Sequence, residues 1–343
     1  MQSGLMGFVM KVNNLRIRGL LNIIISFAVP IIIYIILSFI LPDKISISNI
    51  GFLITQAIMP AILAWGASFN LTAGHSDFSI GASVLFASIM GGNIALSLNL
   101  GVWSLLILCP VFGMISSGIV GLLFVTLKIP SMIVSIGVML VFESICSVVF
   151  GGVGVNLPIS YIVFGSSGMT IIFGIIIFLL AFYLFNYNTL GYHVRALGSN
   201  LTIAAVCGLD IRKLRIKCFV CVGFFAGLYA AMSLGTSTVA KPVSAMGTMR
   251  MAFDAMMCYM VGTSVAGSIN VILAIFVGSL YMQLVNLTLT AVNFPSVFTQ
   301  TVIAFFVLIV MVYSALKHTA ELHRQHEEEF RKAMQSYAAV VGD

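Results

Sequence analysis

Long apolar segments follow one another along the chain, and short polar segments separate them. A bilayer core about 30 Å thick needs about 20 apolar residues for each crossing helix. A strand of a membrane β-barrel would instead alternate apolar and polar residues over about ten positions, whereas residues 171–185 form one continuous apolar run. The pattern predicts an all-α membrane protein. Its ten expected spans are residues 20–41, 51–68, 78–98, 101–127, 131–150, 167–187, 214–236, 251–268, 269–290 and 297–316.

Composition supports this interpretation, because 60% of the residues are hydrophobic, only 8% are charged, and the mean hydropathy is +1.14. A soluble domain carries roughly 25% charged residues, so most of this surface faces lipid. The first nineteen residues are polar, and the apolar run that follows them is too long for the core of a cleaved signal. We therefore expect an uncleaved first span.

Lysine and arginine predict the orientation, since they gather in cytoplasmic loops. With the N-terminus inside, 13 of the 16 basic residues fall on the cytoplasmic side, and only Lys44, Lys241 and Arg250 fall outside. Both termini and the polar stretch 188–213 are then cytoplasmic. The formal net charge of +6 is a consequence of topology and predicts no nucleic-acid partner. We expect a transmembrane domain over residues 1–316, with a cytoplasmic segment 1–19, and a cytoplasmic tail over residues 317–343.

The predicted tail is charged, and its polar residues lie all round a helix. Glu327 and Arg331 are spaced to pair on such a helix. His323 and His326 stand among many charges, which is typical of a solvated face and a weak indication of a metal site.

Two polar segments rich in small residues interrupt the apolar pattern, at residues 70–81 and 235–247. They occupy matching places if spans 2–5 and 7–10 are repeats, and the repeats are then inverted, because span 2 runs inward and span 7 outward. Interrupted segments at matching places in two halves indicate a translocation path. The alternative is that both are ordinary loops at the membrane surface.

Three acidic residues lie within or beside spans, where a charge must face a cavity or a partner. Arg250 precedes Asp254 by four residues, which favours an ion pair with a structural role. Asp77 precedes the third span and favours helix capping. Glu143 has no partner in sequence, so pathway lining and a buried helix contact both remain open. The candidates for the path are Asn70, Asp77, Ser79, Glu143 and Asp254.

Enzyme chemistry has no support in the sequence. Metal-protease, serine-hydrolase and metal-cluster motifs are missing, and so is the P-loop that holds nucleotide phosphates. We expect no catalytic residue, no metal and no cofactor on this chain, so ATP-driven transport would place ATP and magnesium on another polypeptide. Cys218 and Cys221 have CxxC spacing but no second pair, and we interpret them as core-filling residues.

The polar stretch predicts a short helix that projects into the cytoplasm. Ser199 or Asn200 is suited to cap its start, and Gly208 is suited to end it after Val206. Apolar residues such as Leu201 and Val206 lie on it, which is typical of an element that docks into a partner.

The same stretch resembles the cytoplasmic motif of ribose-type ABC permeases, through Gly191, Ala196, Gly198, Asn200, Ala204, Ala205 and Gly208. Residues 70–81 resemble a second motif of that family, with Gly74, Asp77, Ser79 and Gly81 in place. Residues 253–255, 262–267, 128–130 and 151–152 are also similar, so the resemblance covers about residues 50–316.

The resemblance implies a permease that pairs with a second permease subunit in a bacterial cytoplasmic (inner) membrane. It implies a cytoplasmic ATPase that docks on a coupling helix, and an extracytoplasmic solute-binding protein that delivers substrate. The coupling residues would be Gly198, Ser199, Asn200, Leu201, Ala204, Ala205 and Gly208. The substrate class it implies is a monosaccharide, with relatives that carry autoinducer-2, nucleosides or branched-chain amino acids.

The chain departs from the family pattern at His75, at Glu143-Ser144, at Ser268 and in the single glycine before Thr263. These departures fit a divergent partner in a heterodimer, and a homodimer is the alternative. A second class, the ion-coupled secondary transporter, also uses inverted repeats and intramembrane acids. Uptake that collapses with an uncoupler while ATP is maintained would distinguish it. An intramembrane enzyme or a channel has no supporting constellation.

Overall fold

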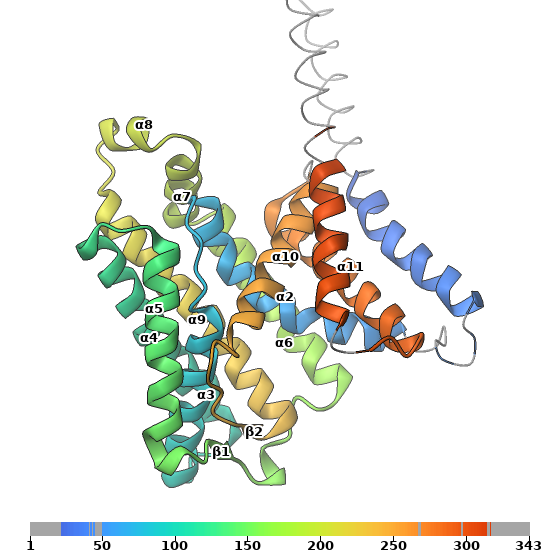
Figure 1. Cartoon of the computed structure of the whole chain (residues 1–343), viewed down its shortest axis with the longest axis horizontal. Helices are drawn as coiled ribbons and strands as arrows, with labels where there is room; N and C mark the ends of the chain where they lie inside the picture. Colours follow the sequence, from blue (N-terminus) through green and yellow to red (C-terminus); the bar gives the residue numbers. More distant parts are fainter. Residues whose placement is uncertain are drawn as a thin grey trace, which may run out of the picture.

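Helices occupy all ten segments that the sequence predicts to span the membrane (Figure 1). The structure is a computed structural model, and it describes residues 22–40, 50–266, 269–295 and 298–313 together with Pro42, Lys44 and Leu316. Within these residues, eight helices are long and apolar enough to cross a membrane. The other two, α10 and Phe298–Tyr313, are shorter. The predicted segments 1–19 and 317–343 lie outside the described residues.

The helices in the ten predicted segments are Asn22–Ile40, α2 (Ile50–Thr72), α3 (Ile80–Ser97), α4 (Leu105–Leu127), α5 (Ser131–Val148), α6 (Ser167–Asn186), α9 (Ile211–Ser237), α10 (Met249–Val265), α11 (Val271–Ala291) and Phe298–Tyr313. Two short helices, α7 (Thr189–Ser199) and α8 (Leu201–Val206), connect α6 to α9. Single 3-10 turns occur at Val102–Ser104, Val149–Gly152 and Ile159–Tyr161. One antiparallel pair, β1 (Val155–Asn156) with β2 (Val239–Ala240), lies at the end of the bundle opposite α7 and α8 (Figure 1).

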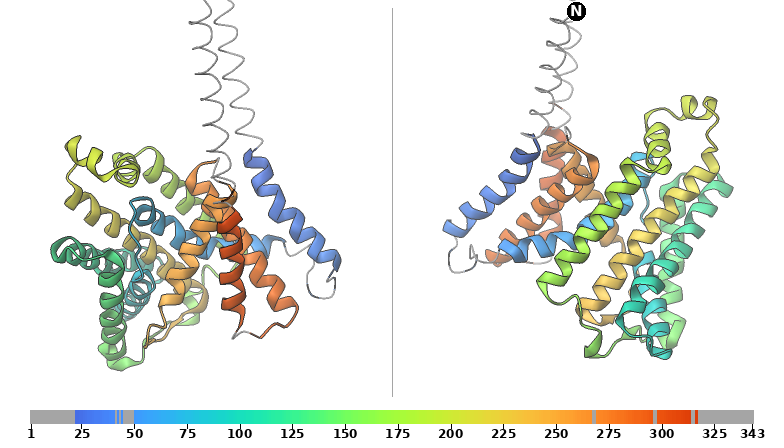
Figure 2. Two further views of the ribbon diagram at one scale, coloured as in Figure 1. Left: turned by 45° about the horizontal axis from the view of Figure 1, so that its top comes forward. Right: turned by 180° about the vertical axis from the view of Figure 1, so that it is seen from behind.

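The helix contacts follow a similar pattern in the two predicted repeats. Helix α2 packs on α9, α10 and α11, and its counterpart α9 packs on α2, α3 and α4. Within the halves, α3 packs on α4 as α10 packs on α11. Helix Asn22–Ile40 stands outside this arrangement, beside α11 and away from α4 and α5 (Figure 2).

Helices α4 and α9 approach so closely that only glycine fits at their crossing. A Cβ on Gly113 would collide with the carbonyl oxygen of Gly223, and a Cβ on Gly223 with that of Gly113. One helical turn further along α9, a Cβ on Gly227 would collide with the backbone of α4 at Cys109 and Pro110. In lipid, helices associate through van der Waals contact rather than the hydrophobic effect. Small residues at a crossing stabilise the pair because they let the two backbones approach closely.

Aromatic side chains fill the space between the two halves. Trp65 of α2 is buried, and its Nε1 donates a hydrogen bond of 3.0 Å to the carbonyl oxygen of Ile272 at the start of α11. The ring of Phe69, one turn further along α2, stacks on Phe225 of α9 at 6.2 Å and meets the edge of Phe185 of α6 at 5.5 Å. These contacts fix α2 at the centre of the bundle.

The boundaries of the polar segments differ from those that the sequence predicts. Helix α2 continues to Thr72, so Asn70 is helical, and the irregular backbone covers only residues 73–79. Helix α9 continues to Ser237, which shortens the second segment to residues 238–248. Helix α9 also begins inside the predicted polar stretch, at Ile211, and α7 and α8 together fill most of the rest of that stretch. Packing against neighbouring helices stabilises helical turns that the polar composition alone disfavours.

The α4–α9 crossing gives a direct test of this packing. We expect Gly113→Ala to lower the thermal unfolding midpoint of the purified protein, because overpacking a close contact costs about 1–3 kcal/mol. Gly118→Ala on the same helix is the control, since its new Cβ would meet only Val220 at an ordinary 3.5 Å. Equal midpoints for the two variants would show that the crossing is looser than described.

Candidate functional site

The two polar segments lead to the N-termini of α3 and α10, and these two helix ends touch. A Cβ on Gly81 in the first turn of α3 would collide with the carbonyl oxygen of Thr248, the N-cap residue of α10. Each N-terminus carries the positive end of a helix dipole and unpaired N–H groups. Two such ends side by side require negative or accepting groups around them.

Asp77 is one of these groups, and it binds two of the other path candidates. Its Oδ1 accepts hydrogen bonds from the backbone N–H of Ser79, at 2.9 Å, and from the Ser79 hydroxyl, at 2.6 Å. The Asn70 amide nitrogen donates to Oδ2 at 3.4 Å, and all three side chains are buried. Asp77 therefore secures the N-cap residue of α3 rather than capping the first turn itself.

Glu143 is the second acceptor, and its partners come from the other repeat. Its Oε1 accepts from the Thr248 backbone N–H at 2.9 Å and from the Thr248 hydroxyl at 2.6 Å, and its Oε2 accepts from the Met246 N–H at 3.0 Å. The side chain is buried. Of the two sequence interpretations of Glu143, the structure favours the buried helix contact, because the carboxylate is occupied at the N-terminus of α10.

Helix α5 thus holds both irregular segments. Two turns before Glu143, the Ser135 hydroxyl accepts a hydrogen bond of 3.1 Å from the backbone N–H of Phe78. Irregular backbone at membrane depth is stable only when protein satisfies its polar groups. Ser135 and Glu143 of α5 supply hydrogen-bond acceptors for backbone N–H groups in residues 73–79 and 238–248.

Among the acidic candidates, Asp254 borders a polar cavity. The predicted ion pair is present, with Arg250 Nε 3.9 Å from Asp254 Oδ2, and the Gln300 amide donates to Oδ1 at 3.4 Å. The two side chains of the ion pair remain 68% and 38% exposed, so the pair lies on the surface of the bundle rather than inside it.

The cavity has a volume of about 220 Å³ and lies between α2, α9, α10 and α11. Its polar lining, besides Asp254, consists of Gln56, Tyr229, Gln283 and Asn286. Sequence reasoning considered the acidic residues of the spans and the polar residues of segment 70–81, and it missed these groups. Gln283 and Asn286 were detectable as two amides three residues apart in an apolar span, a spacing that places them on one helix face.

The short helix that the sequence predicts after Asn200 is present as α8. The Asn200 side chain caps it by accepting from the backbone N–H groups of Thr202 and Ile203, at 2.9 and 3.0 Å. Gly208 follows it with a φ of +82°, as expected for a left-handed helix end. Ala204 is buried, and the side chains that face outward include Leu201, Ile203, Ala205 and Val206.

Asp210 is the N-cap residue of the next helix, α9. Its carboxylate accepts a hydrogen bond from the Lys213 backbone N–H at 3.1 Å and forms an ion pair of 3.2 Å with the Lys213 ammonium group. These contacts hold the pKa of Asp210 below its ordinary value. Both α8 and α9 thus begin at a capping side chain, Asn200 and Asp210, and these caps give the α8–α9 connection a defined geometry.

Helix α7 links α8 to the first polar segment. A Cβ on Gly198 would collide with the carbonyl oxygen of Thr72, the last residue of α2, and a Cβ on Gly191 with that of Phe185 in α6. The polar segment with Asp77 begins directly after Thr72. A displacement of α7 therefore acts on the end of α2 at van der Waals contact.

His75, where the chain departs from the family pattern, lies beside this link. Its ring meets the edge of Phe124 of α4 at 5.0 Å, and Arg215 of α9 lies over the same Phe124 ring at 5.2 Å. The imidazole therefore acts as a packing group between the first polar segment and α4.

Comparison with known proteins identifies the family. Residues 49–312 match the family model described as "Branched-chain amino acid transport system / permease component". The chain belongs to this permease family. It is a multi-pass inner-membrane protein, the membrane-spanning subunit of an ATP-binding-cassette importer, and a transport protein rather than an enzyme.

Individual relatives are distant but cover nearly the whole chain. The permease is 24% identical to the ribose import permease of Haemophilus influenzae, over 84% of this chain and 91% of that protein. It is 22% identical to the L-arabinose ABC transporter permease of Azospirillum brasilense, over 82% and 84%. It is 23% identical to the autoinducer 2 import permease of Escherichia coli O157:H7, over 93% and 92%. No solved structure matches the chain.

The contact between Glu143 and the α10 N-terminus can be tested by substitution. We expect Glu143→Ala to lower the unfolding free energy by about 2–4 kcal/mol, because the buried N–H and hydroxyl groups of Thr248 and the partly buried N–H of Met246 lose their acceptor. Thermal unfolding in detergent measures the effect. Ser144→Ala is the control, since the Ser144 hydroxyl is exposed and bonds only to the Leu140 carbonyl of its own helix. Equal stability of the two variants would contradict the capping role.

Proposed function

We propose that this permease carries a monosaccharide along a path between itself and a second permease subunit. The observation that supports this most strongly is the polar face around Asp254. A charged or amide group that faces hydrocarbon is costly, so such groups in a span face protein or a water-filled cavity. Arg250 and Gln56 are exposed on this face, and the pair formed by Arg250 and Asp254 is only partly covered.

A second subunit against this face would enclose it and complete the path. Its partner there is either another copy of this chain or a related permease. The lining chemistry supports the substrate class, because the amides of Gln56, Gln283 and Asn286 both donate and accept hydrogen bonds, as sugar hydroxyls require. The relatives named for ribose and L-arabinose support the same class. Autoinducer-2, a nucleoside or a branched-chain amino acid is the alternative cargo within the same type of transporter.

The proposal includes a cytoplasmic ATPase that docks on α8 and binds ATP and magnesium itself, and an extracytoplasmic solute-binding protein. Exposed Leu201, Ile203 and Val206 give α8 an apolar surface on a rigid, capped helix. Closure of the ATPase would push on α8 and α7, and the contact of Gly198 with Thr72 would carry the displacement to α2 and residues 73–79. Those residues meet the N-terminus of α10, so both repeats respond to the same push.

An ion-coupled mechanism has less support from the geometry. Asp77 and Glu143 are each occupied by several hydrogen bonds from protein donors, and Asp254 is paired with Arg250. A coupling ion would have to displace these protein partners before it could bind to any of the three carboxylates.

A charge on the docking surface should block coupling. We expect Ala205→Glu to lower ATP-dependent uptake at least about tenfold, because an unpaired charge buried in an interface costs several kcal/mol. Ala205 is exposed in the permease alone, so insertion and thermal stability should remain unchanged. Thr126→Glu, at the exposed C-terminal end of α4, is the control. Normal uptake in the Ala205→Glu variant would refute docking through α8.

The polar lining should set the transport rate. We expect the double variant Gln283→Leu with Asn286→Leu to lower uptake about fivefold or more, through the loss of two hydrogen bonds of about 0.5–1.5 kcal/mol each. Thr288→Val on the same helix lies outside the lining and should transport normally. ATPase binding, measured by co-purification, should be unaffected in all variants. Unchanged uptake in the double variant would place the path elsewhere.

A further inference from the structure

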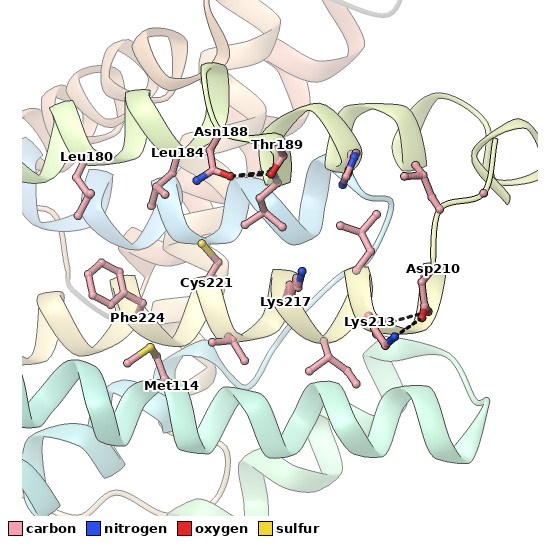
Figure 3. A pocket seen from close by; sticks show the side chains of 17 residues that line it. Met114, Leu180, Leu184, Asn188, Thr189, Asp210, Lys213, Lys217, Cys221 and Phe224 are labelled. Carbon is pink, nitrogen blue, oxygen red and sulfur yellow. Dashed lines mark hydrogen bonds and ion pairs between the residues drawn. The ribbon is translucent and has the colours of Figure 1, made fainter.

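A groove with a volume of about 800 Å³ lies on the side of the bundle where α7 and α8 project (Figure 3). Its floor is one face of α9, its upper wall is the end of α6 with the start of α7, and α4 reaches it through Met114. This volume falls within the range of small-molecule and cofactor sites, roughly 300–1,000 Å³. Neither the polar cavity at Asp254 nor the exposed apolar surface of α8 belongs to it.

One half of the groove is apolar. Leu180 and Leu184 of α6 face Cys221 and Phe224 of α9 across it, and Met114 closes the end (Figure 3). This half lies along parts of α4, α6 and α9 that are predicted to be within the membrane. A flexible hydrocarbon chain is the ligand that such a lining accommodates.

The other half of the groove is cationic. Lys213 and Lys217 stand one turn apart on α9, and exposed His193 lies on the facing wall in α7. Asp210 is the acidic residue in the lining, and it forms an ion pair with Lys213. Within the part of the chain that the structure describes, no carboxylate pairs with Lys217. The groove therefore carries an excess positive charge next to its apolar half.

We propose that this groove binds an acidic phospholipid of the cytoplasmic leaflet. The phosphate lies at Lys213 and Lys217, and one acyl chain follows Leu184, Cys221 and Phe224 into the membrane. The positions of lysine and arginine along the chain place this end of the bundle at the cytoplasmic surface, where basic pockets between spans bind anionic headgroups. A neutral phospholipid fits the apolar half equally well, but it leaves the lysine charges uncompensated.

The lining also connects the lipid to the coupling element. Asn188 and Thr189 at the start of α7 border the groove, as do Gly208, Leu209 and Asp210 after α8. These are the two ends of the α7–α8 element. A lipid in the groove braces both ends and holds α8 in place relative to α9.

The test uses the full-length permease exchanged into nanodiscs of equal parts phosphatidylglycerol and phosphatidylcholine. After extraction, native mass spectrometry measures the lipid that remains bound. We expect the wild type to retain phosphatidylglycerol in preference to phosphatidylcholine. Lys217→Gln should lower that preference about fivefold, and the double variant with Lys213→Gln should lower it about fivefold again.

Arg212→Gln is the matched control, because Arg212 is exposed in the same turn as Lys213 but does not line the groove. It should keep the wild-type preference. Cys221→Trp should fill the apolar half and lower the retention of both lipids, with the lysines intact. Inorganic phosphate should not displace the bound lipid.

Several results would overturn the proposal. They are equal retention of the two lipids by the wild type, an equal loss of preference in Arg212→Gln, or unchanged retention in Cys221→Trp. Should the double variant fail to fold, Lys217→Gln alone decides, since Lys217 is exposed and has no ion pair among the described residues.

Discussion

Every polar backbone group at membrane depth must find a partner inside the protein, and this constraint determines the centre of the permease. Two irregular segments, residues 73–79 and 238–248, lead to helices that begin against each other. Asp77 secures the first break from within, and Glu143 secures the second from α5. Without these carboxylates, two helix N-termini with unpaired N–H groups would meet in a region without water.

This arrangement allows a rigid scaffold to contain a movable part. Glycines at the α4–α9 crossing bring two backbones into direct contact, which fixes that pair of helices. The irregular segments, by contrast, depend on a few side-chain hydrogen bonds, and those of Glu143 cross from one half of the bundle to the other. In the proposed mechanism, a displacement of α7 acts on Thr72. This residue is the end of α2, where helical hydrogen bonding stops and the segment held by side-chain hydrogen bonds begins.

Polar groups divide into two kinds in this permease. Asn70, Asp77, Ser79 and Glu143 are buried and hydrogen-bonded, so they stabilise the helix breaks. Asp254 and the amides near it line a cavity on the surface of the bundle, and this is the cavity that we propose receives the solute. The sequence places both kinds in similar apolar surroundings, and only their neighbours in space distinguish them.

The sequence by itself determined the membrane class, the ten helical segments, the capped helix after Asn200 and the Arg250–Asp254 pair. All of these depend on local spacing, because span length, capping and i,i+4 pairing involve residues close together in the chain. Only the tertiary structure decided the partner of Glu143, which lies 105 positions away at Thr248. The same is true of the cavity with Gln56 and Gln283, and of the extension of α2 to Thr72. These features arise from helix packing, which no single segment encodes.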